Sequence, residues 1–192
     1  MDFDLTGKML ISTPAMGDPR FAHSVIMLCA HSGEGAFGLV INRPIPQLTL
    51  ADVLAQLDIA AQAVPADHPV LAGGPVETAR GFVLHDDAGH EAGADADEAS
   101  QRLPGGLALS ASTGILSAIA EGRGPGRFRL ALGYAGWGPG QLESEIGQNA
   151  WLTCDARPDL IFASTHGDAQ WRAALESIGV DPLSLSPVAG RA

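Results

Sequence analysis

Glycine recurs at every second position in one short stretch, between a predicted strand and a predicted helix. Gly136, Gly138 and Gly140 form the pattern G-x-G-x-G. Glycines in this context cradle the phosphates of a dinucleotide, and an acid about 20 residues on holds the ribose. Asp155 meets that spacing, but the third glycine of the fingerprint would stand where this chain has Gln141. The match to a dinucleotide site is therefore weak.

The helix predicted after these glycines carries acids near its start. Glu143 and Glu145 suit the positive end of a helix dipole, and the same charge competes with an incoming phosphate. Gln141 and Glu145 share one helix face, which we expect to border solvent or a cleft. We expect Trp137 to cover the core, with its indole N–H bound to a partner. We predict a structural loop here, with a cleft wall as the alternative.

Two further turns place polar groups where a small ligand could bind. Asn-Arg-Pro offers the side chains of Asn42 and Arg43, and Gly-Gly-Pro exposes backbone at Gly73 and Gly74. Such groups more often cap strands, but they are also the donors that line a cleft. The candidate ligand-binding residues are Asn42, Arg43, Gly73, Gly74, Trp137, Gly138, Gly140, Gln141 and Glu145.

The chemistry of metals and nucleophiles has weaker candidates. His85, Asp86, Asp87 and His90 lie close in sequence but match no zinc spacing, so we predict no metal site. The serine elbow G-x-S-x-G is absent. We predict no catalytic residue and no cofactor.

The two cysteines lie in apolar, strand-like runs. Cys29 has His31 on the same strand face, but no positive charge or helix N-terminus that would activate its thiol is evident. Cys154 stands in a similar run. We predict both as buried free thiols, as in a reducing compartment.

The charge balance excludes some partners. A net charge of −11, with 11 Lys and Arg against 22 Asp and Glu, argues against direct binding to nucleic acid. The small basic cluster of Arg123, Arg127 and Arg129 is expected to be an ordinary solvated edge. No apolar run approaches the roughly 18 residues of a membrane helix, and the acidic start is not that of a secretory signal. We predict a cytoplasmic protein without membrane association, whose partner is an unknown protein or small molecule.

Hydrophobic runs predict strands over much of the chain. The expected strands cover residues 8–12, 24–30, 37–44, 69–75, 81–86, 107–112, 127–136, 150–155 and 159–164. Pro44 and Pro46 are expected to end the third strand. Four helices are expected at residues 49–60, 113–122, 141–146 and 167–179. Clustered strands with scattered helices favour an α+β fold.

The organisation of the chain is simple. Its length of 192 residues and the lack of a linker predict a single domain over residues 1–192. Residues 86–106 are rich in acids and are expected to form a flexible insertion. Residues 181–192 are expected to form an irregular tail.

Six segments of the chain match the motifs of one protein family, in the same order. They are GKMLISTPAMGDPRFAHSVIMLCAH, GAFGLVINRP, AGGPV, LGYAGWGPGQLESEI, AWLTCD and WRAAL. Their order and spacing resemble the AlgH/YqgE family of small bacterial proteins over nearly the whole chain. The resemblance implies a bifurcated sheet that curls toward a pseudo-barrel, flanked by about four helices. It implies no established reaction and no catalytic residues, and it associates some members with transcriptional regulation.

Two functions follow as hypotheses. The first is an uncharacterised AlgH/YqgE-like protein that serves as a non-catalytic binding or regulatory module and acts through a partner. The alternative is a hydrolase or nucleotide-acting enzyme whose cleft is formed by the turns at residues 42–44, 73–75 and 136–141. A regulator that binds DNA directly is disfavoured by the negative charge.

Overall fold

The computed structural model describes residues 4–65, 67–87 and 100–185, which form an α+β fold of ten strands, five α-helices and two short 3-10 helices. The strands are β1 (Lys8–Ser12), β2 (Val25–Ser32), β3 (Gly35–Val40), β4 (Pro44–Thr49), β5 (Pro69–Ala72), β6 (Val76–Asp86), β7 (Gln101–Leu103), β8 (Leu107–Ser110), β9 (Phe128–Trp137) and β10 (Trp151–Asp155). The helices are α1 (Leu50–Gln56), α2 (Thr113–Ala120), α3 (Gln141–Gly147), α4 (Pro158–Ile161), α5 (Gly167–Ser177), η1 (Pro19–Phe21) and η2 (Pro182–Ser184).

The strands form one sheet that divides at β9. Its main path runs β10-β1-β2-β3-β9-β6-β8-β7, while β5 pairs with β9 and β4 pairs with β5. β5 lies parallel to the first half of β9, opposite Leu130 to Leu132. β3 lies antiparallel to the second half, opposite Ala135 to Trp137. The bifurcated sheet expected from the family resemblance is therefore confirmed.

Glycine allows the backbone to fork at this point. The N–H of Val40 in β3 donates to the carbonyl of Gly73 at 2.8 Å, which joins β3 to the end of β5. A Cβ on Gly74 would lie 2.0 Å from the carbonyl carbon of Tyr134 in β9. Gly133 itself has a φ of 73°, which side-chain-bearing residues rarely adopt. The Gly-Gly-Pro turn thus serves close backbone packing where the sheet divides.

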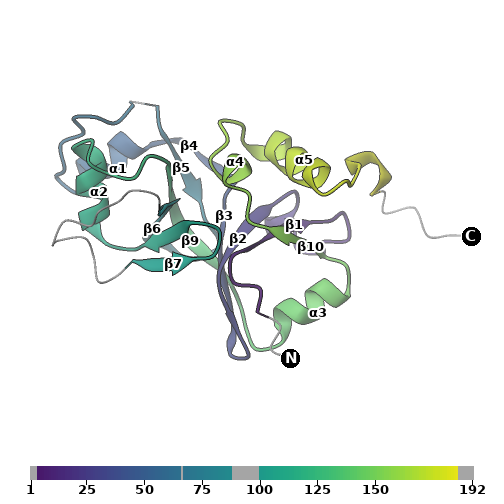
Figure 1. The fold of residues 1–192 in the computed structure, drawn as a ribbon. Coiled ribbons are helices and arrows are strands. Elements are labelled where there is room, and N and C mark those ends of the chain that lie inside the picture. The colour runs from purple at the N-terminus through teal and green to yellow at the C-terminus, as the bar shows by residue number, and fades with distance from the viewer. Residues whose placement is uncertain (1–3, 66, 88–99, 186–192) are drawn as a thin grey trace, which may run out of the picture.

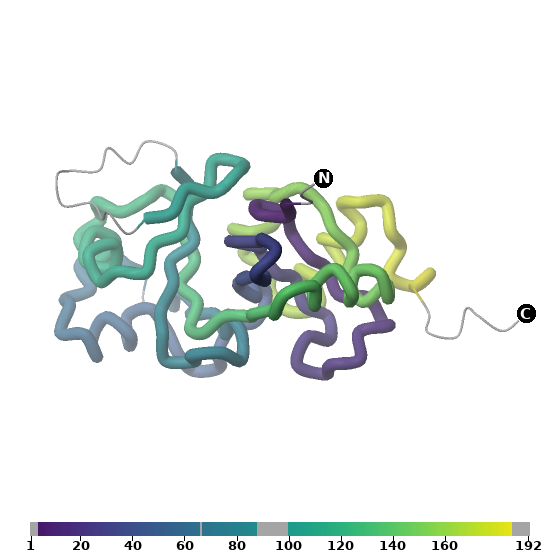
Figure 2. The backbone as a smooth tube through the Cα atoms, turned by 90° about the horizontal axis from the view of Figure 1, so that it is seen from below, coloured from purple at the N-terminus to yellow at the C-terminus, as the bar shows by residue number. Residues whose placement is uncertain are grey.

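The helices cover three separate apolar clusters. α5 packs Trp171 against the largest cluster, and α3 packs Leu142 against a second. α1 and α2 pack Leu54 and Leu116 against a third. Figure 1 shows α1 and α2 at one end of the molecule and α3 and α5 at the other, and Figure 2 shows the same separation from below. The first helix begins as its sequence predicts, because Thr49 and Asp52 form a capping box.

Two local predictions were wrong. Residues 159–164 were expected to form a strand, but Pro158–Ile161 is the short helix α4, with proline at its first turn. Pro44 and Pro46 were expected to end a strand, yet Pro44–Thr49 is strand β4. Among the described strands β4 pairs with β5 alone, so its prolines remove N–H groups that no second strand would need.

The predicted acidic insertion over residues 86–106 overlaps the sheet at both of its ends. Asp86 is the last residue of β6, and Gln101–Leu103 forms β7. Residues 88–99, including the candidate metal ligand His90, lie outside the described residues. The predicted tail contains the 3-10 turn Pro182–Ser184, and residues 186–192 are likewise not described.

Candidate functional site

The glycine-rich loop after β9 holds a hydrogen-bonded cluster around one carboxylate. Oε2 of Glu145 accepts the indole N–H of Trp137 at 2.9 Å and that of Trp151 at 2.7 Å. Oε1 of Glu145 accepts from Nε2 of Gln141 at 2.9 Å. Oε1 of Gln141 accepts the backbone N–H of Gly138 at 3.1 Å. Four predicted site residues therefore come together, and their polar groups bind one another.

The two tryptophans of this cluster are buried. Trp137 is 6% exposed and Trp151 is 2% exposed, so neither indole N–H is free to bind bulk water. The ring of Phe21 packs on both, with centroids 6.4 Å from Trp137 and 5.9 Å from Trp151. Glu145 therefore supplies the acceptor that lets two large aromatic rings enter the core.

The neighbouring acid, Glu143, contacts a different element. Nε2 of His31 lies 3.0 Å from Oε1 of Glu143, and Nδ1 of His31 accepts the backbone N–H of Leu5 at 3.1 Å. The second contact assigns the proton to Nε2, which then donates to Glu143. The pKa of Glu143 is lowered, first by a hydrogen bond from its own backbone and further by His31. This pair ties α3 to the end of β2 and to the N-terminal segment.

The Asn-Arg-Pro turn is also bound internally. Oδ1 of Asn42 accepts the N–H of Val25 at 2.9 Å, and Nδ2 donates to the carbonyls of His23 at 2.8 Å and Gly167 at 3.1 Å. Asn42 is fully buried. Arg43 donates to the carbonyl of Ala22 at 2.5 Å and also to that of Arg20. Both side chains thereby fix the segment that ends β3 against η1 and α5.

The predicted site residues thus form two clusters and a fork. Arg43 binds backbone carbonyls of the η1 segment, and the Trp137–Glu145 cluster contacts the same segment through the ring of Phe21. Gly73 and Gly74 lie at the divided sheet. Gly140 caps α3 with a φ of 71°, and a Cβ at Gly138 would meet nothing within 4 Å. No hydrogen bond joins Asn42 or Arg43 to Gln141 or Glu145, all of which lie in the described part of the chain.

An apolar cavity of about 340 Å³ lies elsewhere, between α1, α2 and the sheet. This volume is in the range of small-molecule sites. Its lining residues are Leu48, Val53, Gln56, Leu57, Ala79, Gly81, Val83, Ala111, Ser112, Thr113, Leu116, Leu130 and Leu132. Sequence reasoning missed it, because it depends on how two helices far apart in the chain meet β6 and β9. The sequence predicts both helices, at residues 49–60 and 113–122, but an apolar helix face is also what core packing requires.

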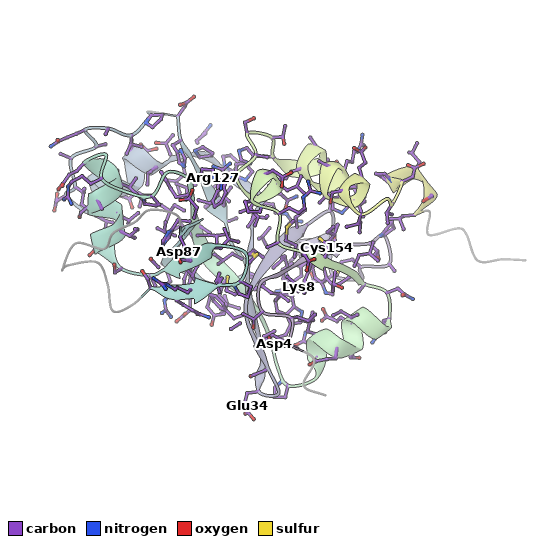
Figure 3. All side chains as sticks on the ribbon, in the orientation of Figure 1. Asp4, Lys8, Glu34, Asp87, Arg127 and Cys154 are labelled. Carbon is purple, nitrogen blue, oxygen red and sulfur yellow. The ribbon has the colours of Figure 1, made fainter. Side chains whose placement is uncertain are left out.

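His85 and Asp86 are hydrogen-bonded, Cys29 is buried as expected, and Cys154 is only half-buried. Nε2 of His85 lies 3.0 Å from Oγ of Ser110, and Asp86 accepts from Nε of Arg127 at 3.2 Å. Burial raises the pKa of the Cys29 thiol to about 12 and also raises that of Cys154. Figure 3 labels Cys154 on β10. Among residues 4–65, 67–87 and 100–185, no group of three His, Cys, Asp or Glu side chains is placed to hold a metal ion.

The fold and the glycine-containing turns define an α+β protein whose sheet divides at β9. The chain belongs to the AlgH-like family, whose model matches residues 9–183. A UPF0301 protein of Paracoccus denitrificans is 55% identical over 98% of this chain and 97% of its own length. The solution structure of the AlgH protein from Pseudomonas aeruginosa is 43% identical, with a TM-score of 0.75 over 99% of this chain and 97% of that one.

A more distant structure shares the fold. The crystal structure of protein DIP2367 from Corynebacterium diphtheriae has a TM-score of 0.72 at 23% identity, and the match covers 90% of this chain and 86% of that one. In the described residues, no helix is long and apolar enough to cross a membrane.

Proposed function

We propose that this protein is a non-catalytic binding module, and that its ligand is a small, largely apolar molecule held between α1, α2 and the sheet. The observation that carries the proposal is the cavity of about 340 Å³, whose lining is mostly aliphatic. An apolar molecule leaving water for such a site gains roughly 25 cal/mol for each Å² that it buries. Leu57, at the mouth, is 42% exposed, which is high for a large aliphatic side chain.

The hydrogen bonding of the polar residues supports binding over catalysis. Glu145 and Asn42, the best candidates for chemistry in the predicted cleft, accept and donate within the fold. A general base must reach a substrate proton at hydrogen-bonding distance, and these groups would first have to leave buried partners. The hydrolase or nucleotide-acting alternative therefore has less support. It predicts that Glu145→Gln abolishes a hydrolytic activity while leaving the protein folded.

A regulatory role through a partner fits the same reading. Ligand binding between α1 and α2 would change the surface that these helices present, and a partner could read that change. A cytoplasmic location fits the two free cysteines, Cys29 and Cys154. Transcriptional regulation would then be indirect, since the charge of −11 opposes contact with DNA.

The test uses a substitution that fills the cavity without strain. A Cβ on Gly81 would lie 3.6 Å from Leu130 and 3.8 Å from Leu132, which are ordinary contacts, and Gly81 is in a strand. Gly81→Val therefore projects methyl groups into the cavity. Gly136→Val is the matched control, because Gly136 is an exposed glycine of β9 outside the lining.

The probe is anilinonaphthalene sulfonate, whose fluorescence rises in apolar sites, with 1-octanol as the competitor. We expect saturable fluorescence with the wild-type protein and with Gly136→Val, displaced by 1-octanol. We expect its loss with Gly81→Val. Equal binding by all three proteins, or no binding by the wild type, would refute the cavity as the site.

A further inference from the structure

The guanidinium of Arg129 is buried without a counter-charge. Arg129 is 8% exposed, against the expectation that it belongs to a solvated edge. Nη2 donates to the carbonyl of Ala163 at 2.5 Å, and Nη1 donates to that of Phe128 at 3.3 Å. Nε is inaccessible and has no partner among the described residues. None of the ion pairs found in residues 4–65, 67–87 and 100–185 includes Arg129.

Burying the charge of Arg129 in this way costs free energy unless a counter-charge compensates it. A buried charge is normally paired, because its hydration is lost on folding. Arg129 is joined only to neutral carbonyls, and three of the five N–H groups of a guanidinium remain after the two bonds above. An anion is the partner that this charge lacks.

Other unpaired polar atoms surround the same corner. His166 precedes α5, and its Nδ1 is buried without a partner. Gln170, in the first turn of α5, is fully buried; its Nε2 donates to the carbonyl of Leu160 at 2.8 Å, and its side chain interacts with that of His166. Ala163, which binds Arg129, lies between α4 and α5. The start of β9, the α4–α5 connection and the start of α5 therefore meet here.

A second histidine, His68, precedes β5, which pairs with the first half of β9. His68 stacks on Phe128, the neighbour of Arg129, with ring centroids 4.5 Å apart, and its Nε2 is buried and unpaired. Burial and then the charge of Arg129 lower the pKa of His68, while Asp67 opposes this effect. Burial and then Arg129 also lower the pKa of His166, against a smaller effect of Gln170. The charge of Arg129 thus acts on both histidines, and both residues are half-buried.

We propose that Arg129, His166 and His68 form a binding site for a compact phosphate-class oxyanion, as inorganic phosphate or the phosphate group of a small metabolite. The donors come from three elements, and a tetrahedral oxyanion accepts from several directions, whereas a carboxylate accepts in one plane. α5, which has eleven residues, adds its positive end to the same corner, and the acid of its first turn, Asp168, lies 3.0 Å from Nδ1 of His23. None of the three residues lines the apolar cavity, so this site is independent of the proposed function.

The neighbouring Arg127 provides a matched control. Figure 3 labels it, and its guanidinium lies 5.1 Å from the ring centroid of Phe162, which follows α4. Unlike Arg129, it is paired with Asp86 at 3.2 Å, and its side chain is 52% exposed. Arg127→Gln and Arg129→Gln remove the same charge two residues apart, but only the second removes the unpaired buried donor.

The experiment is thermal unfolding with sodium phosphate against sodium chloride at equal ionic strength. Phosphate is expected to raise the Tm of the wild type and of Arg127→Gln, and to leave that of Arg129→Gln unchanged. Sodium acetate and glycerol phosphate form the other arms: the second should act like phosphate and the first should not. A phosphate response retained in Arg129→Gln, or absent from the wild type, would overturn the proposal.

A measurement on the wild type keeps the test valid if Arg129→Gln does not fold. In histidine ring NMR spectra, phosphate should shift the signals of His166 and His68 and raise their pKa values, because a bound anion favours the charged ring. The rings of His23 and His85 serve as internal controls. Shifts of equal size at all four rings would indicate general salt effects and would contradict the site.

Discussion

The carboxylate of Glu145 should contribute more to the free energy of unfolding than is usual for a side chain on a partly exposed helix. Removing it by Glu145→Ala leaves the indole N–H groups of Trp137 and Trp151 without an acceptor. Each buried donor left unpaired costs about 1–3 kcal/mol, so we expect a loss of about 3 kcal/mol in the free energy of unfolding. Glu145→Gln keeps one oxygen for the two indoles but sets its amide against that of Gln141, and should cost about 1 kcal/mol.

The assay is urea unfolding followed by far-UV circular dichroism, which does not depend on the fluorescence of the altered tryptophans. Ser144→Ala is the control in the same helix, since Ser144 is exposed and should change stability by no more than about 0.5 kcal/mol. The indole N–H resonances of the two tryptophans should move upfield in Glu145→Ala. If Glu145→Ala costs no more than Ser144→Ala, Glu145 does not hold the aromatic pair, and a role for it in ligand binding gains support.

Three further predictions concern the fork, the thiols and the buried histidines. Gly74→Ala should destabilise the fold by about 3 kcal/mol or more because its Cβ would overlap the backbone at Tyr134, while Gly138→Ala, which meets open space, should be nearly neutral; equal thermal stabilities would contradict this reading. Iodoacetamide at mildly alkaline pH should label Cys154 slowly and Cys29 only in urea, because burial raises the pKa of both thiols and that of Cys29 to about 12. Labelling is read by mass spectrometry, and rapid labelling of Cys29 in the folded protein would show that its strand opens. The free energy of unfolding should fall as pH drops below about 6.5, because His68 and His166 have lowered pKa values in the folded state and the unfolded chain therefore binds protons first. In phosphate-free buffer, the double variant His68→Asn with His166→Asn should show a weaker dependence on pH. An unchanged pH profile in that variant would argue against this role of the two histidines.

The sequence predicted most elements because their patterns are local. The apolar runs of β1, β2 and β9 and the capped helix α1 are formed where the residue types place them. The run at residues 159–164 failed because a short apolar segment fits a strand or a buried helical turn equally well. The two prolines of β4 predicted the end of a strand, but a strand with one neighbour tolerates a missing N–H.

The site was harder to predict because its contacts are long-range. Gln141 and Glu145 do share one helix face, and the partner that Trp137 needed is Glu145 itself. Trp151 could not be added, since it reaches Glu145 only after β10 pairs with β1. Arg129 was assigned to solvent from its alternation with Phe128, which shows two opposite faces but not which helix covers either.

The divided strand β9 also bears on how the chain is made. β3, β5 and β6 are synthesised before it, and each pairs with β9 along one edge. Until residue 137 has left the ribosome, those strands carry open edges, the feature that favours aggregation. The sheet of the nascent protein therefore cannot be completed until β9 has been synthesised. A truncation before β9 should yield insoluble product rather than a smaller folded domain.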